Sequence, residues 1–216
     1  MQGDAESLRR SWLLRALDFG RSPEEIDMKY DKQVIISILS DPVKEIRNMG
    51  RNLYNLNPTK SIWLEVTNGV GVVIQDGDRN LTANSRLYLV GHGTLQGTTL
   101  GGMTGEQVAD ALVGLNFNTI GKISLVSCFA AGLFTELPQL QHFATQLHGH
   151  LGQKYSIHSV LTARRTLITV TQQGRKITHP NPNGASLGSP YLSKRPQSKI
   201  EIFWTPTGEQ QWRYAY

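Results

Sequence analysis

The apolar positions of this chain form short uninterrupted runs separated by stretches of helical spacing, and this alternation predicts an α/β fold. Uncharged runs closed by small residues are typical of strands buried on both faces of a parallel sheet. Runs of this kind occupy residues 33–39, 87–90 and 123–127. Two more runs, at 61–67 and 71–75, flank Asn68-Gly69, a dipeptide that favours a tight hairpin turn. The expected architecture is a central, mostly parallel sheet flanked by helices.

Capping signals and apolar spacing place the helices between these strands. Asp41-Pro42 begins the first, because aspartate is a favoured N-cap and proline is favoured at the first helical position. Thr104 and Gln107 have the form of a capping box for the second helix, which would cross back to the next strand in the right-handed sense. Apolar spacing predicts a third helix over residues 138–150, followed by a strand at 156–162.

One compact domain is expected over residues 30–216, preceded by an arm over residues 1–29 that contains a short amphipathic helix. Towards the other end, residues 167–171, a turn, and residues 199–204 predict a terminal hairpin-like sheet. No run reaches the roughly 20 apolar residues of a membrane helix, and the first residues do not resemble a signal peptide. The sequence therefore predicts no association with a membrane.

Positive charge is concentrated in the last quarter of the chain. The net charge is +5, and residues 159–216 carry eight basic residues against two acidic ones. This asymmetry indicates a polyanion as partner. Nucleic acid is one candidate, but the segment has no zinc finger, helix-turn-helix or ribonucleoprotein motif, so a compact phosphorylated small molecule fits equally well.

Two of the predicted strands end in reactive side chains, His92 between two glycines and Cys128, the only cysteine in the chain. If the strands are neighbours, imidazole and thiol emerge side by side at the carboxyl edge of the sheet, as a cysteine nucleophile and its proton acceptor require. The backbone amides of Gly93 and Cys128 are then candidate donors to an oxyanion. The alternative is that Cys128 is a small core residue and His92 an ordinary turn residue.

A metal-dependent hydrolase is the weaker interpretation. A single cysteine excludes an internal disulfide and a multi-cysteine zinc site. Three histidines lie close together, but they lack the spacing and the neighbouring carboxylates of a zinc site; they are His142, His148 and His150. Catalysis is therefore expected to need no metal.

The sequence resembles the caspase-like clan of cysteine peptidases from Tyr30 to Trp204, and within it the self-cleaving cysteine protease domain of large bacterial toxins. Those toxins are the multifunctional autoprocessing repeat toxins and the large clostridial glucosylating toxins. The resemblance is carried by residues 30–36, 40–43, 89–93, 125–128, 162–164 and 173–176. It implies that His92 and Cys128 are catalytic and that Asp41 is the acid that steadies His92. Asp41 as a helix cap is an equally open role, and the two are compatible.

The same resemblance implies activation by inositol hexakisphosphate, bound in a C-terminal basic β-flap. The implied phosphate-binding residues are Arg86, Arg164, Arg175, Lys176, Lys194 and Lys199. A further family lysine would fall on Leu56, and Lys60, four residues on, is therefore the seventh effector-binding candidate. A flap tryptophan would fall on Tyr191. Arginine suits this role because it offers paired donors to phosphate, whereas lysine acts as a point charge.

The implied output is cleavage after leucine of the chain's own N-terminal segment or of neighbouring toxin domains. The setting would be a secreted bacterial toxin or effector in the host cell cytosol, with neither a membrane nor nucleic acid as partner. The arm offers Leu13, Leu14 and Leu17 as cleavage sites, with Leu17 preferred. Two alternatives remain, a catalytically silent sensor of inositol phosphates and a nucleic-acid-binding module.

Overall fold

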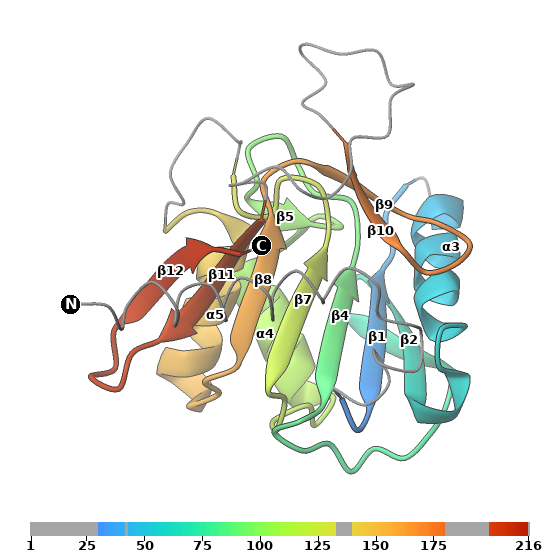
Figure 1. Ribbon diagram of the computed structural model, residues 1–216, viewed down its shortest axis with the longest axis horizontal. Coiled ribbons are helices and arrows are strands. Elements are labelled where there is room, and N and C mark those ends of the chain that lie inside the picture. Colours follow the sequence, from blue (N-terminus) through green and yellow to red (C-terminus); the bar gives the residue numbers. More distant parts are fainter. Residues whose placement is uncertain (1–29, 42, 133–139, 180–198, 216) are drawn as a thin grey trace, which may run out of the picture.

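A computed structural model describes residues 30–41, 43–132, 140–179 and 199–215, and one eight-stranded sheet dominates it (Figure 1). The strand order is β12-β11-β8-β7-β4-β1-β2-β3. The bounds are β1 Gln33–Ile38, β2 Ser61–Thr67, β3 Val70–Gln75, β4 Arg86–Val90, β7 Lys122–Val126, β8 Val160–Arg164, β11 Lys199–Trp204 and β12 Gln210–Tyr214. The five inner strands β2, β1, β4, β7 and β8 are parallel, while β3 and β11 pair antiparallel to their inner neighbours. The predicted α/β architecture is confirmed.

Helices cover both faces of this sheet, which explains why its central strands are apolar throughout. On one face, α4 (Gly105–Gly114) and α5 (Phe143–Tyr155) pack over alternate strand residues such as Leu87 and Leu89. On the other face, α3 (Val43–Tyr54) and the small strand β9 (Leu167–Val170) cover Tyr88 and Val90. The other short elements are η2 Pro58–Lys60, β5 Thr99–Leu100, β6 Met103–Thr104 and β10 Lys176–His179. Among the described helices none is long and apolar enough to cross a membrane.

Two local predictions are confirmed in detail. The Thr104 hydroxyl accepts from the backbone N–H of Gln107, and the Gln107 side chain accepts from the backbone N–H of Thr104, which completes the capping box of α4. Between β2 and β3, Asn68 and Gly69 both adopt positive φ, 50° and 78°, as the tight hairpin turn requires.

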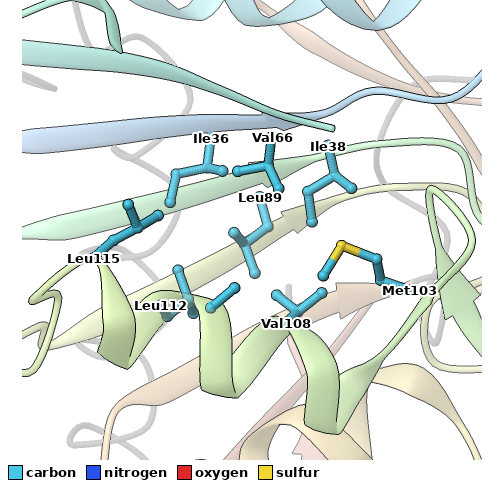
Figure 2. A pocket seen from close by; sticks show the side chains of 9 residues that line it. Ile36, Ile38, Val66, Leu89, Met103, Val108, Leu112 and Leu115 are labelled. Atoms are coloured by element: carbon cyan, nitrogen blue, oxygen red, sulfur yellow. The ribbon is translucent and has the colours of Figure 1, made fainter. Parts of the chain in front are cut away.

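The apolar layer between the sheet and α4 contains a small internal cavity. In Figure 2 the side chains of the sheet and of the helix point toward one another across it. It is lined by Ile36, Ile38, Val66, Leu89, Met103, Val108, Ala111, Leu112 and Leu115. Because this lining offers no polar group to a ligand, the cavity belongs to the packing of the core.

The third helix lies further along the chain than its spacing predicted. It begins at Phe143, after an extended His142, and ends at Tyr155, followed by Ser156 in the left-handed conformation with φ 57°. Two turns of this helix face the β11–β12 hairpin closely: a Cβ on Gly152 would lie 2.2 Å from Trp204. Gly152 therefore lets α5 approach β11 closely, and it lies within the helix. The following strand accordingly starts at Val160 rather than at residue 156.

The C-terminal strands do not form the separate hairpin-like sheet that was predicted. Strand β9 turns at residues 172–174 and pairs with β10, whereas β11 joins the large sheet beside β8. The reason is burial, because Ile200 and Ile202 pack completely into the core beneath α5. Strand β12 was not predicted, since its residues alternate between polar and aromatic at an edge of the sheet. The arm with Leu13, Leu14 and Leu17, and the loop with Lys194 and Tyr191, lie outside the described residues.

His148 ties α5 to the β11–β12 hairpin in its neutral form. Its Nε2–H donates to the carbonyl of Ser159 (3.1 Å), and its Nδ1 accepts from the Gln210 amide (2.8 Å). The ring stacks on Trp204 with 5.2 Å between centroids. Burial, reinforced by the neighbouring charge of His158, lowers the pKa of His148 to about 4.

This histidine predicts an acid-sensitive fold. Between pH 6.5 and pH 4 the unfolded chain takes up a proton at residue 148 that the folded chain refuses, so the free energy of unfolding should fall by up to about 3 kcal/mol over that window. Urea unfolding of wild type and His148→Gln at several pH values measures this. The variant should lose this part of the pH slope, and parallel slopes in the two proteins would contradict the assignment.

Candidate active site

His92 and Cys128 leave neighbouring parallel strands at the same level. Val90 of β4 lies opposite Val126 of β7, and each reactive residue follows two positions later. The ladder continues past the strand ends, because the Gly91 N–H donates to the Val126 carbonyl (3.4 Å). The expectation that the two strands are neighbours is therefore confirmed. The segments that carry His92 and Cys128 lie side by side at the carboxyl edge of the sheet.

Gly93 makes the contact between these two segments possible. A Cβ at this position would lie 2.0 Å from the carbonyl oxygen of Cys128 and 2.6 Å from the Ser127 hydroxyl, so a residue with any side chain would push them apart. The backbone after Cys128 turns sharply, with Phe129 at φ 52°. The Phe129 N–H donates to the Thr166 carbonyl (3.3 Å) and is therefore not offered to an oxyanion, whereas the amides of Gly93 and Cys128 stay the predicted donors.

Burial favours the protonated form of the Cys128 thiol. The residue is half-buried and packs against the core that α3 and β9 share. Its Sγ donates to the Ile168 carbonyl of β9 at 3.9 Å. Burial raises the pKa of the thiol, and the negative charge of Glu45 adds to that rise. A proton acceptor is therefore needed before this sulfur can act as a nucleophile.

Among the described residues, Glu45 supplies the carboxylate that contacts His92. Its Oε2 lies 3.9 Å from the Nε2 of the imidazole, and that Nε2 is buried without a hydrogen bond. Glu45 stands in the first turn of α3, while Asp41 lies exposed in the turn before this helix. The structure thus adds Glu45 to the site beside Asp41. Sequence reasoning missed it because an acid in a first helical turn is common for reasons of the helix dipole alone.

A second group of functional candidates lies on the sheet face that α3 leaves open. Arg86 and Lys122 begin neighbouring strands in register, and Lys199 pairs with Arg164 further across the sheet. Lys176 of β10 joins them and lies 4.4 Å from the ring of Tyr88, over which Arg86 also sits at 4.6 Å. We call this group the cationic cluster; its members are Arg86, Lys122, Arg164, Lys176 and Lys199.

Burial and mutual repulsion within this cluster lower the pKa values of its lysines Lys176 and Lys199. Burial, followed by the charges of the other four members, lowers the pKa of Lys176 well below its ordinary value. Burial and the charges of Arg164, Lys122 and Arg86 lower the pKa of Lys199 to about 8. Crowded cations of this kind favour the binding of an anion, because the anion relieves their mutual repulsion.

Four of the seven predicted effector-binding residues belong to this cluster, namely Arg86, Arg164, Lys176 and Lys199. Arg175 is exposed in the turn beside Lys176, Lys60 is exposed in η2, and Lys194 lies outside the described residues. Lys122 was missed, although its place at the start of a strand beside that of Arg86 is the signal that would have found it. Leu56, where a lysine was expected, instead packs against Gly174 of the β9–β10 turn, where a Cβ would meet it at 2.3 Å.

Residues 28–179 match the sequence model of the Peptidase C80 family. The chain belongs to that family. It is therefore a cysteine peptidase, and the match includes His92, Cys128 and every element from β1 to β10. A search of curated proteins found no match. Within the described ranges no three histidine, cysteine or acidic residues are grouped as metal ligands would be.

Proposed function

We propose that this C80 domain is an autoprocessing endopeptidase in which Cys128 is the nucleophile, His92 the general base, and inositol hexakisphosphate the activator. The observation that carries the proposal is the register of β4 and β7, which brings the two reactive residues to the same point of one sheet edge. The cationic cluster supports the activator, because a ligand of dense negative charge would relieve the repulsion among its members.

The chemistry follows from these positions. His92 removes the thiol proton, and the thiolate attacks the carbonyl carbon of the scissile peptide bond. The π electron pair of the carbonyl group moves onto its oxygen. The amides of Gly93 and Cys128 donate to that oxyanion. The tetrahedral intermediate collapses with cleavage of the C–N bond, and His92 gives its proton to the departing amine. Water, deprotonated by His92, then hydrolyses the thioester and restores the thiol.

Backbone contacts offer a route from the cationic cluster to the thiol. The Ala131 N–H donates to the carbonyl of Arg164, a cluster member (3.2 Å). Lys176 lies opposite Val170 on β9, the strand whose Ile168 carbonyl accepts from Cys128. An anion that draws Arg164 and Lys176 together would therefore move the segment that holds the thiol. Activation in this proposal is the release of Cys128 from Ile168 toward His92.

The proposed substrate is a leucine-containing segment of the same polypeptide, in the arm or in neighbouring toxin domains, and the proposed setting is a secreted bacterial toxin or effector in the host cytosol. Incubation of the purified chain with and without inositol hexakisphosphate, followed by mass spectrometry, tests it. A new N-terminus after Leu13, Leu14 or Leu17 is expected only with the ligand. An intact chain at saturating ligand, together with no cleavage of leucine peptides, would overturn the proposal.

Glu45 is proposed to steady His92 in the orientation that receives the thiol proton. Glu45→Gln should lower kcat about tenfold with little change in KM, a modest loss because this carboxylate is 68% exposed. Glu45→Asp should recover part of it. Glu106→Gln, an acid in the first turn of α4, is the matched control and should keep full activity. A larger loss for Asp41→Asn than for Glu45→Gln would assign the role to Asp41 instead.

A further inference from the structure

Glu201 is a carboxylate placed inside the cationic cluster. It lies on β11 two residues after Lys199, so both side chains point to the same face of the sheet. Its Oε1 accepts from the Lys122 ammonium at 3.1 Å, and its Oε2 accepts from two N–H groups of Arg213 at 2.6 and 3.0 Å. Only 14% of the side chain is exposed. A charge this well held is part of the site and not of the solvated surface.

This pairing divides the cluster into two kinds of cation. Among the described residues, Lys122 is the cluster member that has a carboxylate partner. The charges of Arg86, Arg164 and Lys199 all act on Lys176, and Arg86 and Lys176 rest on aromatic rings instead of on an acid. The charge of Glu201 also acts on Lys199, but more weakly than those of the neighbouring cations. Glu201 therefore offsets part of the cluster's positive charge, chiefly at Lys122.

Arg213 is a second ion-pair partner of the Glu201 carboxylate. It belongs to β12, the edge strand, and directs two N–H donors at the same oxygen of Glu201. If Lys122 turned away to a ligand, Glu201 would keep this pair and would not be left as an isolated buried charge. The exchange of Lys122 from carboxylate to phosphate is therefore energetically accessible, but it still brings phosphate close to an acid.

We propose that Glu201 is an internal counter-ion that sets the affinity and the charge selectivity of the cationic cluster, holding Lys122 until a polyanion displaces it. The inference rests on the proposed function, in that it takes the cluster to be the effector site. A ligand with many phosphate groups gains enough contacts to offset its repulsion by Glu201. A ligand with one phosphate group does not, so the acid discriminates against sparsely charged anions.

Calorimetric titration of the full chain with inositol hexakisphosphate and with inorganic phosphate tests this. Glu201→Gln should bind inositol hexakisphosphate about tenfold more tightly, and should gain still more for inorganic phosphate, so that selectivity falls. Glu209→Gln is the matched control, because it removes an exposed acid from the same hairpin and should change affinity less than twofold. Equal or weaker binding by Glu201→Gln would overturn the inference.

A second variant separates charge from folding. Lys122→Gln should weaken binding of inositol hexakisphosphate, and combining it with Glu201→Gln should remove most of the tenfold gain, because the gain comes from freeing this lysine. Full retention of the gain in the double variant would overturn the inference. If wild type and Glu201→Gln bind inositol hexakisphosphate with the same affinity, the inference about Glu201 is overturned and the effector proposal stands. If wild type binds neither anion, the effector proposal is overturned as well.

Discussion

Cys128→Ala should abolish cleavage at every concentration of inositol hexakisphosphate while leaving the affinity for that ligand unchanged. The loss should reach at least about 10⁴-fold, because removal of a peptidase nucleophile leaves only the assistance of binding and the oxyanion donors. Binding should survive because the thiol does not belong to the cationic cluster. Mass spectrometry measures the cleavage, and calorimetry measures the affinity on the same samples.

The same pair of measurements separates the peptidase from a silent sensor. Cysteine-directed labelling of wild type should rise with ligand, since the proposed activation releases the thiol from the Ile168 carbonyl. A wild-type chain that binds the ligand, stays intact and leaves Cys128 unlabelled would favour the sensor. Cleavage that persists in Cys128→Ala would show that another group is the nucleophile.

Lys176→Glu should remove activation by inositol hexakisphosphate. The substitution places a negative charge among Arg86, Arg164 and Lys199, so a ligand of like charge should lose at least about 100-fold in affinity. Cleavage without ligand should stay at its low basal level. Calorimetry and a ligand-dependent cleavage assay check both statements.

Arg79→Glu is the matched charge reversal for this test. Arg79 is half-exposed, pairs with Asp76 in the loop after β3, and is not a member of the cluster. It should leave the affinity within about twofold of wild type. An equal loss in both variants would mean that total charge governs binding, as for a nucleic-acid-binding module, and that the cluster is not a discrete site.

The central sheet and its chemistry were accessible from the sequence for one reason. Strands buried on both faces need uninterrupted apolar runs, so the sequence predicted β1, β4 and β7 directly. The residues that follow β4 and β7 then had to meet if these two strands were neighbours. The capping box of α4 and the Asn68-Gly69 turn depend on local hydrogen bonds, which a few residues specify completely.

The missed features depend on contacts between distant residues. The place of β11 follows from the burial of Ile200 and Ile202 beneath α5, which no local signal reveals. Glu45 reaches His92 only because α3 packs over the carboxyl edge of the sheet. The pairing of Lys122 with Glu201 spans 79 positions and two strands that do not touch one another.

The crowding of Arg164, Lys176 and Lys199 also ties the melting temperature of this domain to its surroundings. An anion that binds the native chain and not the unfolded one stabilises it by mass action, by about 2.7 kcal/mol at one hundred times its dissociation constant. Solutions that contain and lack inositol hexakisphosphate should therefore give different melting temperatures for the same polypeptide. The thermal stability of this fold therefore depends on the anions in solution as well as on the sequence.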